Sequence, residues 1–276
     1  MRGQPYKLTY HPAHDLFPLW SPDGARIAFT SLRELPPQLY ELNAKSAGNE
    51  SVLLKSMSPK VPSAWSLDGR LLLYTSIDPQ NAGDIWALPL VTKAEPFPIL
   101  RTAADERYGT LSPDGRWLAY ISNETGTYQV YVEAFPATGF KRQVSTVGGV
   151  EPSWRHDGEE LFYLAPNQML MAVEVQRHQA TLGFAPPKAL FHAHMAWMEV
   201  QAVARHYAPA RDGQRFLISS ATAEAAPARS RPRSGTRAES RYRAATCCGE
   251  RTGKARGCRC SWFMAVPREP ARSRMK

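Results

Sequence analysis

Five aspartates recur in the same local setting, and paired carboxylates could in principle do acid–base chemistry, as on the two sides of a glycosidic bond. Asp23, Asp68, Asp114, Asp157 and Asp212 lie 45, 46, 43 and 55 residues apart along the chain. Each aspartate is followed by a glycine, at Gly24, Gly69, Gly115, Gly158 and Gly213. Because every aspartate occupies an Asp-Gly turn at the same phase of a repeat, we interpret these residues as structural turn residues.

Histidines and cysteines are the other candidates for chemistry, as metal ligands. His192 and His194 are spaced to share one face of a strand, and His206 is the nearest third candidate. No further ligand follows at a suitable spacing. The four cysteines form a Cys-Cys pair and a Cys-x-Cys pair between 247 and 260, with the wrong spacing for a zinc ribbon. We therefore expect no metal and no other cofactor.

Motifs of common enzyme classes are missing from the sequence. It contains no Gly-x-Ser-x-Gly elbow of a serine hydrolase, and none of the glycine-rich, His-Arg-Asp or Asp-Phe-Gly motifs of a kinase. The run Gly249–Ala255 is one residue short of a phosphate-binding loop, and no serine or threonine follows its lysine. We therefore predict that the chain is not an enzyme and has no catalytic residues.

The Asp-Gly motif marks a repeat of about 45 residues, the length of a four-stranded propeller blade. Two large apolar residues follow each aspartate at four and six positions, which predicts the second strand of a hairpin. These pairs are Ile27/Phe29, Leu72/Tyr74, Leu118/Tyr120, Leu161/Tyr163 and Phe216/Ile218. Other apolar runs predict third strands near 39–42, 85–88, 130–132 and 170–173. Fourth strands are expected near 52–54, 98–100, 143–145 and 189–191.

We therefore expect an all-β protein, a β-propeller with about four complete blades and partial ones, over residues 5–220. The complete blades are expected at about 10–55, 56–100, 101–146 and 147–192. A partial blade is expected at 197–220, and Lys7–Thr9 is predicted to be the last strand of a preceding blade.

The repeat Pro-x-Trp-Ser-Pro-Asp-Gly-x-x-Ile-Ala-Phe at 18–29 resembles that of TolB-like propellers, also called PD40 or WD40-like. Within 49–191, several segments are similar to the C-terminal propeller of bacterial serine/threonine protein kinases. They include Leu-Leu-Tyr at 72–74, Asp-Ile-Trp-Ala-Leu-Pro-Leu at 84–90 and Glu-Leu-Phe-Tyr at 160–163. The TolB-like resemblance implies a ring of six or seven blades, so that this chain holds an incomplete ring. The kinase resemblance implies a signalling receptor.

The net charge of +9 comes from one end of the chain. Residues 228–276 hold 14 basic and 3 acidic residues, which leaves 20 basic and 22 acidic residues in 1–227. Periodicity and cysteine use change at the same point. We hypothesise that residues from about 228 are read in a shifted frame; the alternative is a genuine disordered basic tail. Nucleic-acid binding through this tail is a third hypothesis, although we expect no specific nucleic acid as a partner.

Function in a propeller lies on its faces and in its channel mouth. We expect a protein or a small-molecule ligand to bind there, on the connections between blades near 10–17, 56–61, 101–109, 147–151 and 192–206. The candidate binding residues are Arg107, Tyr108, Glu151, Met195 and Trp197. Met195 and Trp197 lie in the longest connection, where the alternative role is to plug the channel.

These observations favour a non-catalytic binding or sensor module, a fragment of a bacterial signalling protein. The alternative is the propeller remnant of a prolyl-oligopeptidase-type hydrolase that lacks its catalytic domain. No stretch reaches the roughly 18–20 apolar residues of a membrane helix, so we expect no membrane insertion. Residues 1–5 lack the apolar core of a signal peptide, which predicts a cytoplasmic chain as written. Membership of a membrane-anchored kinase would make it extracytoplasmic.

Overall fold

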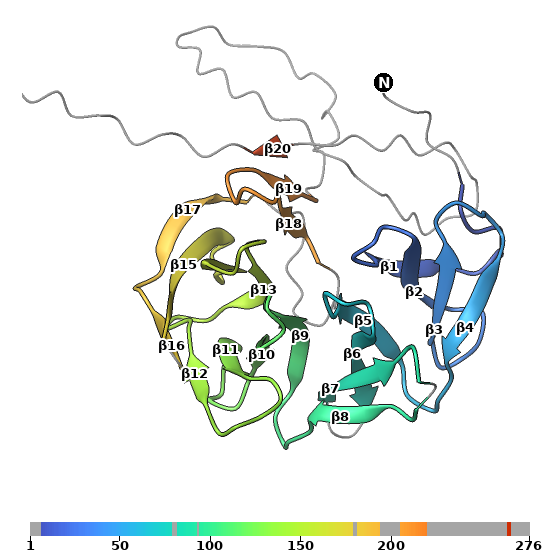
Figure 1. Ribbon diagram of the computed structural model, residues 1–276, viewed down its shortest axis with the longest axis horizontal. Helices are drawn as coiled ribbons and strands as arrows, with labels where there is room; N and C mark the ends of the chain where they lie inside the picture. The colour runs from blue at the N-terminus through green and yellow to red at the C-terminus, as the bar shows by residue number, and fades with distance from the viewer. Residues whose placement is uncertain are drawn as a thin grey trace, which may run out of the picture.

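The computed structural model describes residues 7–78, 82–92, 94–178, 181–193 and 205–219, together with the backbone of 264–265. In these residues the regular elements are β-strands, and they form antiparallel sheets around a common centre (Figure 1). The predicted all-β fold of four-stranded blades is confirmed. The described residues contain no helix that could span a membrane.

The first three sheets are four-stranded blades whose strands pair in chain order. Blade 1 contains β1 (Asp15–Trp20), β2 (Arg26–Ser31), β3 (Gln38–Asn43) and β4 (Glu50–Leu54). Blade 2 contains β5 (Lys60–Trp65), β6 (Leu71–Asp78), β7 (Ala82–Pro89) and β8 (Phe97–Leu100). Blade 3 contains β9 (Glu106–Leu111), β10 (Trp117–Ser122), β11 (Gln129–Ala134) and β12 (Lys141–Gln143). The first strand of each blade is its inner strand.

Blade 4 has one strand more than the sequence predicted. It contains β13 (Val150–Trp154), β14 (Glu160–Leu164), β15 (Met169–Arg177), β16 (Leu182–Phe184) and β17 (Lys188–His192). The additional strand is β16, which pairs with the far end of the long strand β15, while β17 pairs with its beginning. β15 has nine residues, so its edge is long enough to pair with both β16 and β17, which explains the additional strand.

A fifth sheet contains β18 (Tyr207–Pro209), β19 (Phe216–Ile218) and β20 (Met264–Ala265). β20 lies within 228–276, for which the sequence left a shifted reading frame or a disordered basic tail as hypotheses. It pairs with Phe216 and Leu217 at the free edge of β19, which offers backbone hydrogen bonds to an extended segment. The rest of 228–276 lies outside the described residues.

The Asp-Gly turn closes the hairpin between the first two strands of a blade. In blade 2 the Ser66 hydroxyl donates to Asp68 Oδ1 at 2.6 Å and accepts from the Leu71 amide at 2.9 Å. Asp68 Oδ1 also accepts from the Arg70 amide at 3.0 Å. Gly69 has φ = 67°, a left-handed conformation that glycine adopts without steric cost. Blades 1 and 3 repeat these bonds, which explains why the motif recurs with so little change.

Tryptophans join neighbouring blades near the ends of the inner strands. Trp65 Nε1 donates to the Leu19 carbonyl of blade 1 at 3.2 Å, and the Arg26 guanidinium lies 4.7 Å from its ring. Trp154 Nε1 donates in the same way to the Thr110 carbonyl of blade 3, at 3.3 Å. The repeat therefore encodes contacts between blades as well as the hairpin within each blade.

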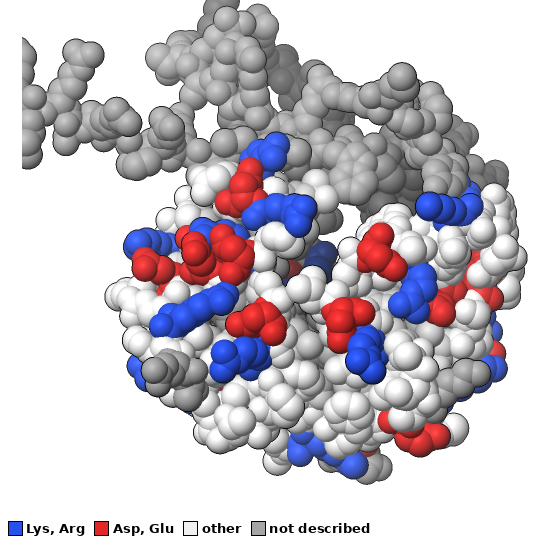
Figure 2. Space-filling model, in the orientation of Figure 1, with Lys and Arg blue, Asp and Glu red and all other residues white. Residues whose placement is uncertain are grey.

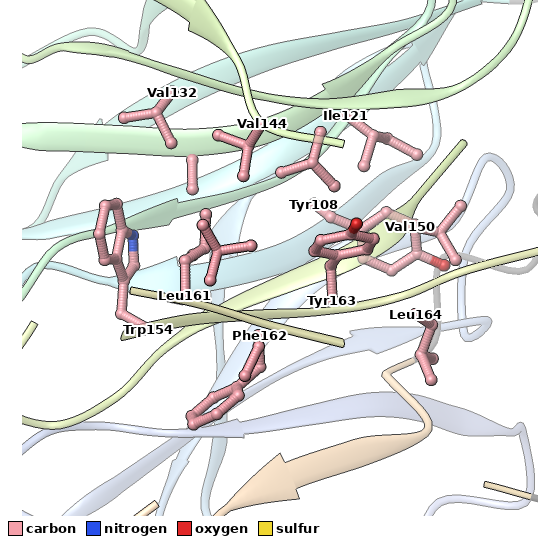
Figure 3. Packing of buried hydrophobic residues seen from close by; sticks show 14 of the residues in the cluster. Tyr108, Ile121, Val132, Val144, Val150, Trp154, Leu161, Phe162, Tyr163 and Leu164 are labelled. Atoms are coloured by element: carbon pink, nitrogen blue, oxygen red, sulfur yellow. The ribbon is translucent and has the colours of Figure 1, made fainter. Parts of the chain in front are cut away.

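The largest apolar cluster lies between blades 3 and 4 and continues to the fifth sheet (Figure 3). Phe162 of blade 4 packs edge-to-face against Phe216, with ring centroids 5.0 Å apart. Phe191 packs against the same ring at 5.6 Å. Aromatic pairs of this geometry add to the free energy gained by burying apolar area, so Phe216 fixes the fifth sheet on blade 4.

The segment before blade 1 does not form the predicted strand. Lys7–Thr9 has no strand assignment in the structure, so that prediction is wrong. The Leu8 carbonyl accepts a hydrogen bond from the Gly48 amide at 3.0 Å, and Leu8 packs against the apolar residues of blade 1. The segment is not a strand because it forms a single hydrogen bond to a loop instead of a ladder of hydrogen bonds with a neighbouring strand.

Ser112→Ala should lower the free energy of unfolding by about 1–3 kcal/mol, because it leaves a buried amide unsatisfied. Ser112 Oγ accepts from the Trp117 amide at 3.0 Å and donates to Asp114 Oδ1 at 2.5 Å. Urea unfolding measures the difference. Ser51→Ala, an exposed serine on β4, is the control and should change stability by less than about 0.5 kcal/mol. Equal stability of the two variants would contradict the role of the serine.

Candidate binding site at the propeller channel

The turn aspartates lie at one end of the blades, and their carboxylates form hydrogen bonds within their own turns. All five glycines have φ between 67° and 72°. Each aspartate accepts a hydrogen bond from the backbone amide two residues later. Hydrogen bonds from the preceding serines and from these amides lower the pKa of Asp23 and Asp68. The carboxylates therefore serve the turns.

Charged side chains around these turns are paired with one another. Figure 2 shows acidic and basic side chains lying next to each other around a central hollow. In blade 4, Arg155 contacts Asp157 at 2.7 Å, Glu159 at 2.5 Å and Glu160 at 2.7 Å. Together with Arg177 they line an open groove of about 660 Å³. Four carboxylates, from Asp157, Glu159, Glu160 and Glu174, face only the two guanidinium groups of Arg155 and Arg177, so the groove has a net negative charge.

A backbone bulge distinguishes the inner strands. Tyr108 and Glu151 each lie three residues before the last residue of β9 and β13, and have φ of 58° and 55°. Phe17 in β1 has the same position and a φ of 55°. The pairing register of each of these strands shifts at this point. A β-bulge re-aims the side chain that it carries, and positive φ outside glycine is a feature of binding sites.

Glu151 is the central residue of a hydrogen-bond network that joins blade 4 to the fifth sheet. Its Oε2 accepts from the His206 amide at 2.7 Å, and its Oε1 lies 2.6 Å from His206 Nδ1. The Tyr207 hydroxyl donates to the Glu151 carbonyl at 2.8 Å. The hydrogen bond from the His206 ring to the Glu151 carboxylate, which is 2% exposed as a residue, raises the pKa of His206 although burial opposes that shift. The pair is a buried carboxylate and imidazole held in one geometry.

Arg205 connects three blades at the centre. Its Nη1 donates to the Pro152 carbonyl of blade 4 at 2.9 Å. Its Nη2 donates to the Ser63 carbonyl of blade 2 at 3.3 Å and to the Tyr108 carbonyl of blade 3 at 3.4 Å. A guanidinium has five donors in a planar fork, which suits it to bind several carbonyl oxygens at once.

Arg107 is anchored between blades 2 and 3. Its Nε donates to Asp105 Oδ1 at 2.6 Å, and the same oxygen accepts from the Gly83 amide of blade 2 at 2.9 Å. Asp105 Oδ2 accepts from the Tyr128 hydroxyl. The Arg107 side chain is only 9% exposed, so its charge is balanced inside the protein.

Three of the five candidate binding residues predicted from the sequence, Arg107, Tyr108 and Glu151, therefore lie together at the channel. Burial raises the pKa of the Tyr108 hydroxyl, and the charges of Glu151, Arg205 and Arg107 all act on this group. Met195 and Trp197 lie outside the described residues. In the part of the chain that the structure describes, no three His, Cys, Asp or Glu residues are grouped to hold a metal ion.

Sequence reasoning missed Arg205 and considered His206 only as a metal ligand. One signal was present: Arg205, His206 and Tyr207 precede the fifth Asp-Gly turn at the phase of an inner strand. His206 falls at the position that Tyr108 and Glu151 occupy in their blades, six residues before the aspartate of the turn. Alignment of the repeats from the turns outward would have placed these residues at the channel.

The His206 imidazole should titrate above its ordinary pKa of about 6.5. A raised pKa means that the pair stabilises the fold fully below about pH 6.5 and loses this contribution as the pH rises through the folded-state value. Glu151→Gln should bring the pKa back to about 6.5 or below, because burial then acts alone. NMR titration of the imidazole protons measures both values. Glu159→Gln, in the charged groove, is the control. An unchanged pKa in Glu151→Gln would rule out the pairing.

No protein-family model and no curated protein matches this sequence. Solved structures do match. A TolB-type protein from Agrobacterium tumefaciens aligns with TM-score 0.51 and 19% identity, over 60% of this chain and 62% of that chain. TolB from Acinetobacter baumannii aligns with TM-score 0.58 and 17% identity, over 76% of this chain and 50% of that chain.

An oligogalacturonate lyase in complex with manganese aligns with TM-score 0.52 and 15% identity, over 77% of this chain and 64% of that chain. The chain thus spans half to two thirds of the length of these proteins. At such identities the likeness concerns the fold alone. On the strength of its blades and of these alignments, the chain has the β-propeller fold of TolB-like proteins.

Proposed function

We propose that the chain is a non-catalytic binding module that recognises a protein or peptide on one face of the propeller. This face is formed by the connections that enter the inner strands and by those between the second and third strands. In antiparallel blades both kinds of connection lie at the same end, opposite the Asp-Gly turns. Loops on a rigid scaffold are the usual place for binding residues.

The observation that carries the proposal is the position of the most exposed apolar side chains. Among the described residues, the three large apolar side chains with the highest exposure are Met57 at 89%, Leu35 at 86% and Val147 at 85%. Leu35 lies between β2 and β3, Met57 between β4 and β5, and Val147 between β12 and β13. All three connections belong to the same face, in blades 1, 2 and 4. Apolar side chains left in water at loop tips are available for a partner to bury.

The channel network supports the proposal because it makes this face rigid. Glu151, Asp105 and Arg205 lie at or near the beginnings of the inner strands, next to the connections that enter them. Asp105 and Arg205 each form hydrogen bonds with more than one element, and Glu151 is held by hydrogen bonds from His206 and Tyr207. A preorganised surface loses less conformational entropy when it binds.

The likeness of the sequence to propellers of bacterial serine/threonine kinases leads us to place the module in a signalling receptor, outside the cytoplasm. The alternative is the propeller of a prolyl-oligopeptidase-type hydrolase without its catalytic domain. The two proposals differ in the neighbouring coding sequence. A receptor requires a kinase domain and a membrane helix, whereas a hydrolase requires a domain with a Gly-x-Ser-x-Gly elbow.

A random-peptide phage library selected on the full chain tests the binding proposal. Selected peptides, resynthesised and measured by calorimetry, should bind the variant L35S/M57S/V147S about tenfold more weakly or worse, because their apolar anchors lose contact area.

The matched control is L67S/V91S, which removes two exposed apolar side chains from the opposite face. It should leave the affinity within about threefold. Peptides that depend on Leu67 and Val91 instead would reverse the assignment of the face. Failure to enrich any peptide above an unrelated protein would contradict the binding role itself.

A further inference from the structure

A second pocket lies between blades 1 and 2, away from the channel. It has a volume of about 340 Å³ and is formed by the end of β4, the connection that follows it, and the side of blade 2 that faces blade 1. Its lining includes Lys60, Ser56, Tyr74 and Trp86. Neither the channel network nor the exposed loop tips involve these side chains.

Lys60 is a buried cation in this pocket. It is the first residue of β5 and is 3% exposed. Its Nζ donates to the Ser58 carbonyl at 3.1 Å and to the Ser56 hydroxyl. Both partners are neutral, and among the described residues no carboxylate lies within ion-pair distance of Nζ. The neighbouring Lys55 differs, because its Nζ forms an ion pair with Glu34 at 2.6 Å.

A buried charge without a counter-ion is costly, and proteins rarely keep one unless something compensates it. The cost is visible in the titration of the group, because burial lowers the pKa of Lys60 to about 8. Lys60 is therefore still mainly protonated at pH 7. An anionic ligand would supply the missing charge and accept the remaining ammonium proton.

The rest of the pocket fits a flat apolar body. Tyr74, which is 2% exposed, lies with its ring centroid 5.8 Å from Lys60 Nζ. Trp86, Leu54 and Pro96 add apolar surface around it. The charged side chains that line the pocket are Lys60, Lys55, which is paired with Glu34, and Glu95, so the formal charge of the lining is +1 and is balanced by a single carboxylate. The Lys60 ammonium group and the Ser76 hydroxyl are the donors for it, since the Ser56 hydroxyl already donates to the Ser58 carbonyl. A dianionic phosphate would need further donors.

We propose that this pocket is a binding site for a small organic monocarboxylate with a flat, apolar body. Its carboxylate lies against Lys60 and its body lies between the aromatic side chains of blade 2 and the end of blade 1. The site shares the connection between β4 and β5 with the peptide-binding face, but it is tested with a different ligand and different variants, so either proposal can fail without the other.

The test uses benzoate and its neutral isostere benzamide with the full chain at pH 7, measured by NMR titration. The wild type should bind benzoate about tenfold more tightly than benzamide, because only benzoate pairs with the ammonium group. Lys60→Met should remove this preference and leave weak binding of both compounds. Lys188→Met, which removes an exposed lysine on β17, is the matched control and should keep the preference.

Near-ultraviolet circular dichroism and the urea midpoint show whether Lys60→Met keeps its fold. A second measurement needs no variant: nuclear Overhauser contacts from the benzoate ring in the wild type should reach Tyr74 and Trp86. Three results would overturn the proposal. They are equal affinity for the two compounds, a preference that survives in a folded Lys60→Met chain, and ring contacts confined to other residues. Absence of saturable benzoate binding up to about 20 mM would do the same.

Discussion

Both sides of a four-stranded blade carry apolar side chains, and each side is buried only where another blade lies against it. Two tryptophans at the same position of the repeat show this dependence. Trp65 is 8% exposed between blades 1 and 2, whereas Trp20, on the side of blade 1 away from blade 2, is 56% exposed. The indole of Trp65 also has a hydrogen-bond partner in blade 1. Packing between blades is therefore the interaction on which the other features of the molecule depend.

The same packing brings the inner strands together at the centre, where buried polar groups need partners on neighbouring blades. Glu151 has its hydrogen-bond partners at the fifth sheet, Asp105 has a partner in blade 2, and Arg205 donates to carbonyl oxygens of three blades. These charges therefore join blades, which is why we assign them to the support of a binding face. Lys60 is the contrasting case, since its ammonium group has only neutral partners among the described residues.

Local sequence was enough to predict the blades, because Asp-Gly turns and alternating apolar residues act within one hairpin. It was not enough for Lys7–Thr9, since an extended segment becomes a strand only beside a partner. Tyr108 and Glu151 were predicted as candidates from their place in the connections, but their positive φ depends on the register with the next strand. The environment of Lys60 could not be predicted either, because a lysine at the start of a strand is usually solvated.

Amide hydrogen exchange in Arg205→Met tests the central claim, that polar contacts at the channel couple separate blades into one platform. The guanidinium binds carbonyl oxygens of blades 2, 3 and 4. The account predicts that amides of β5, β9 and β13 all exchange faster in the variant than in the wild type, while Lys188→Met matches the wild type. Faster exchange confined to β18 and β19, with the three inner strands unchanged, would contradict it.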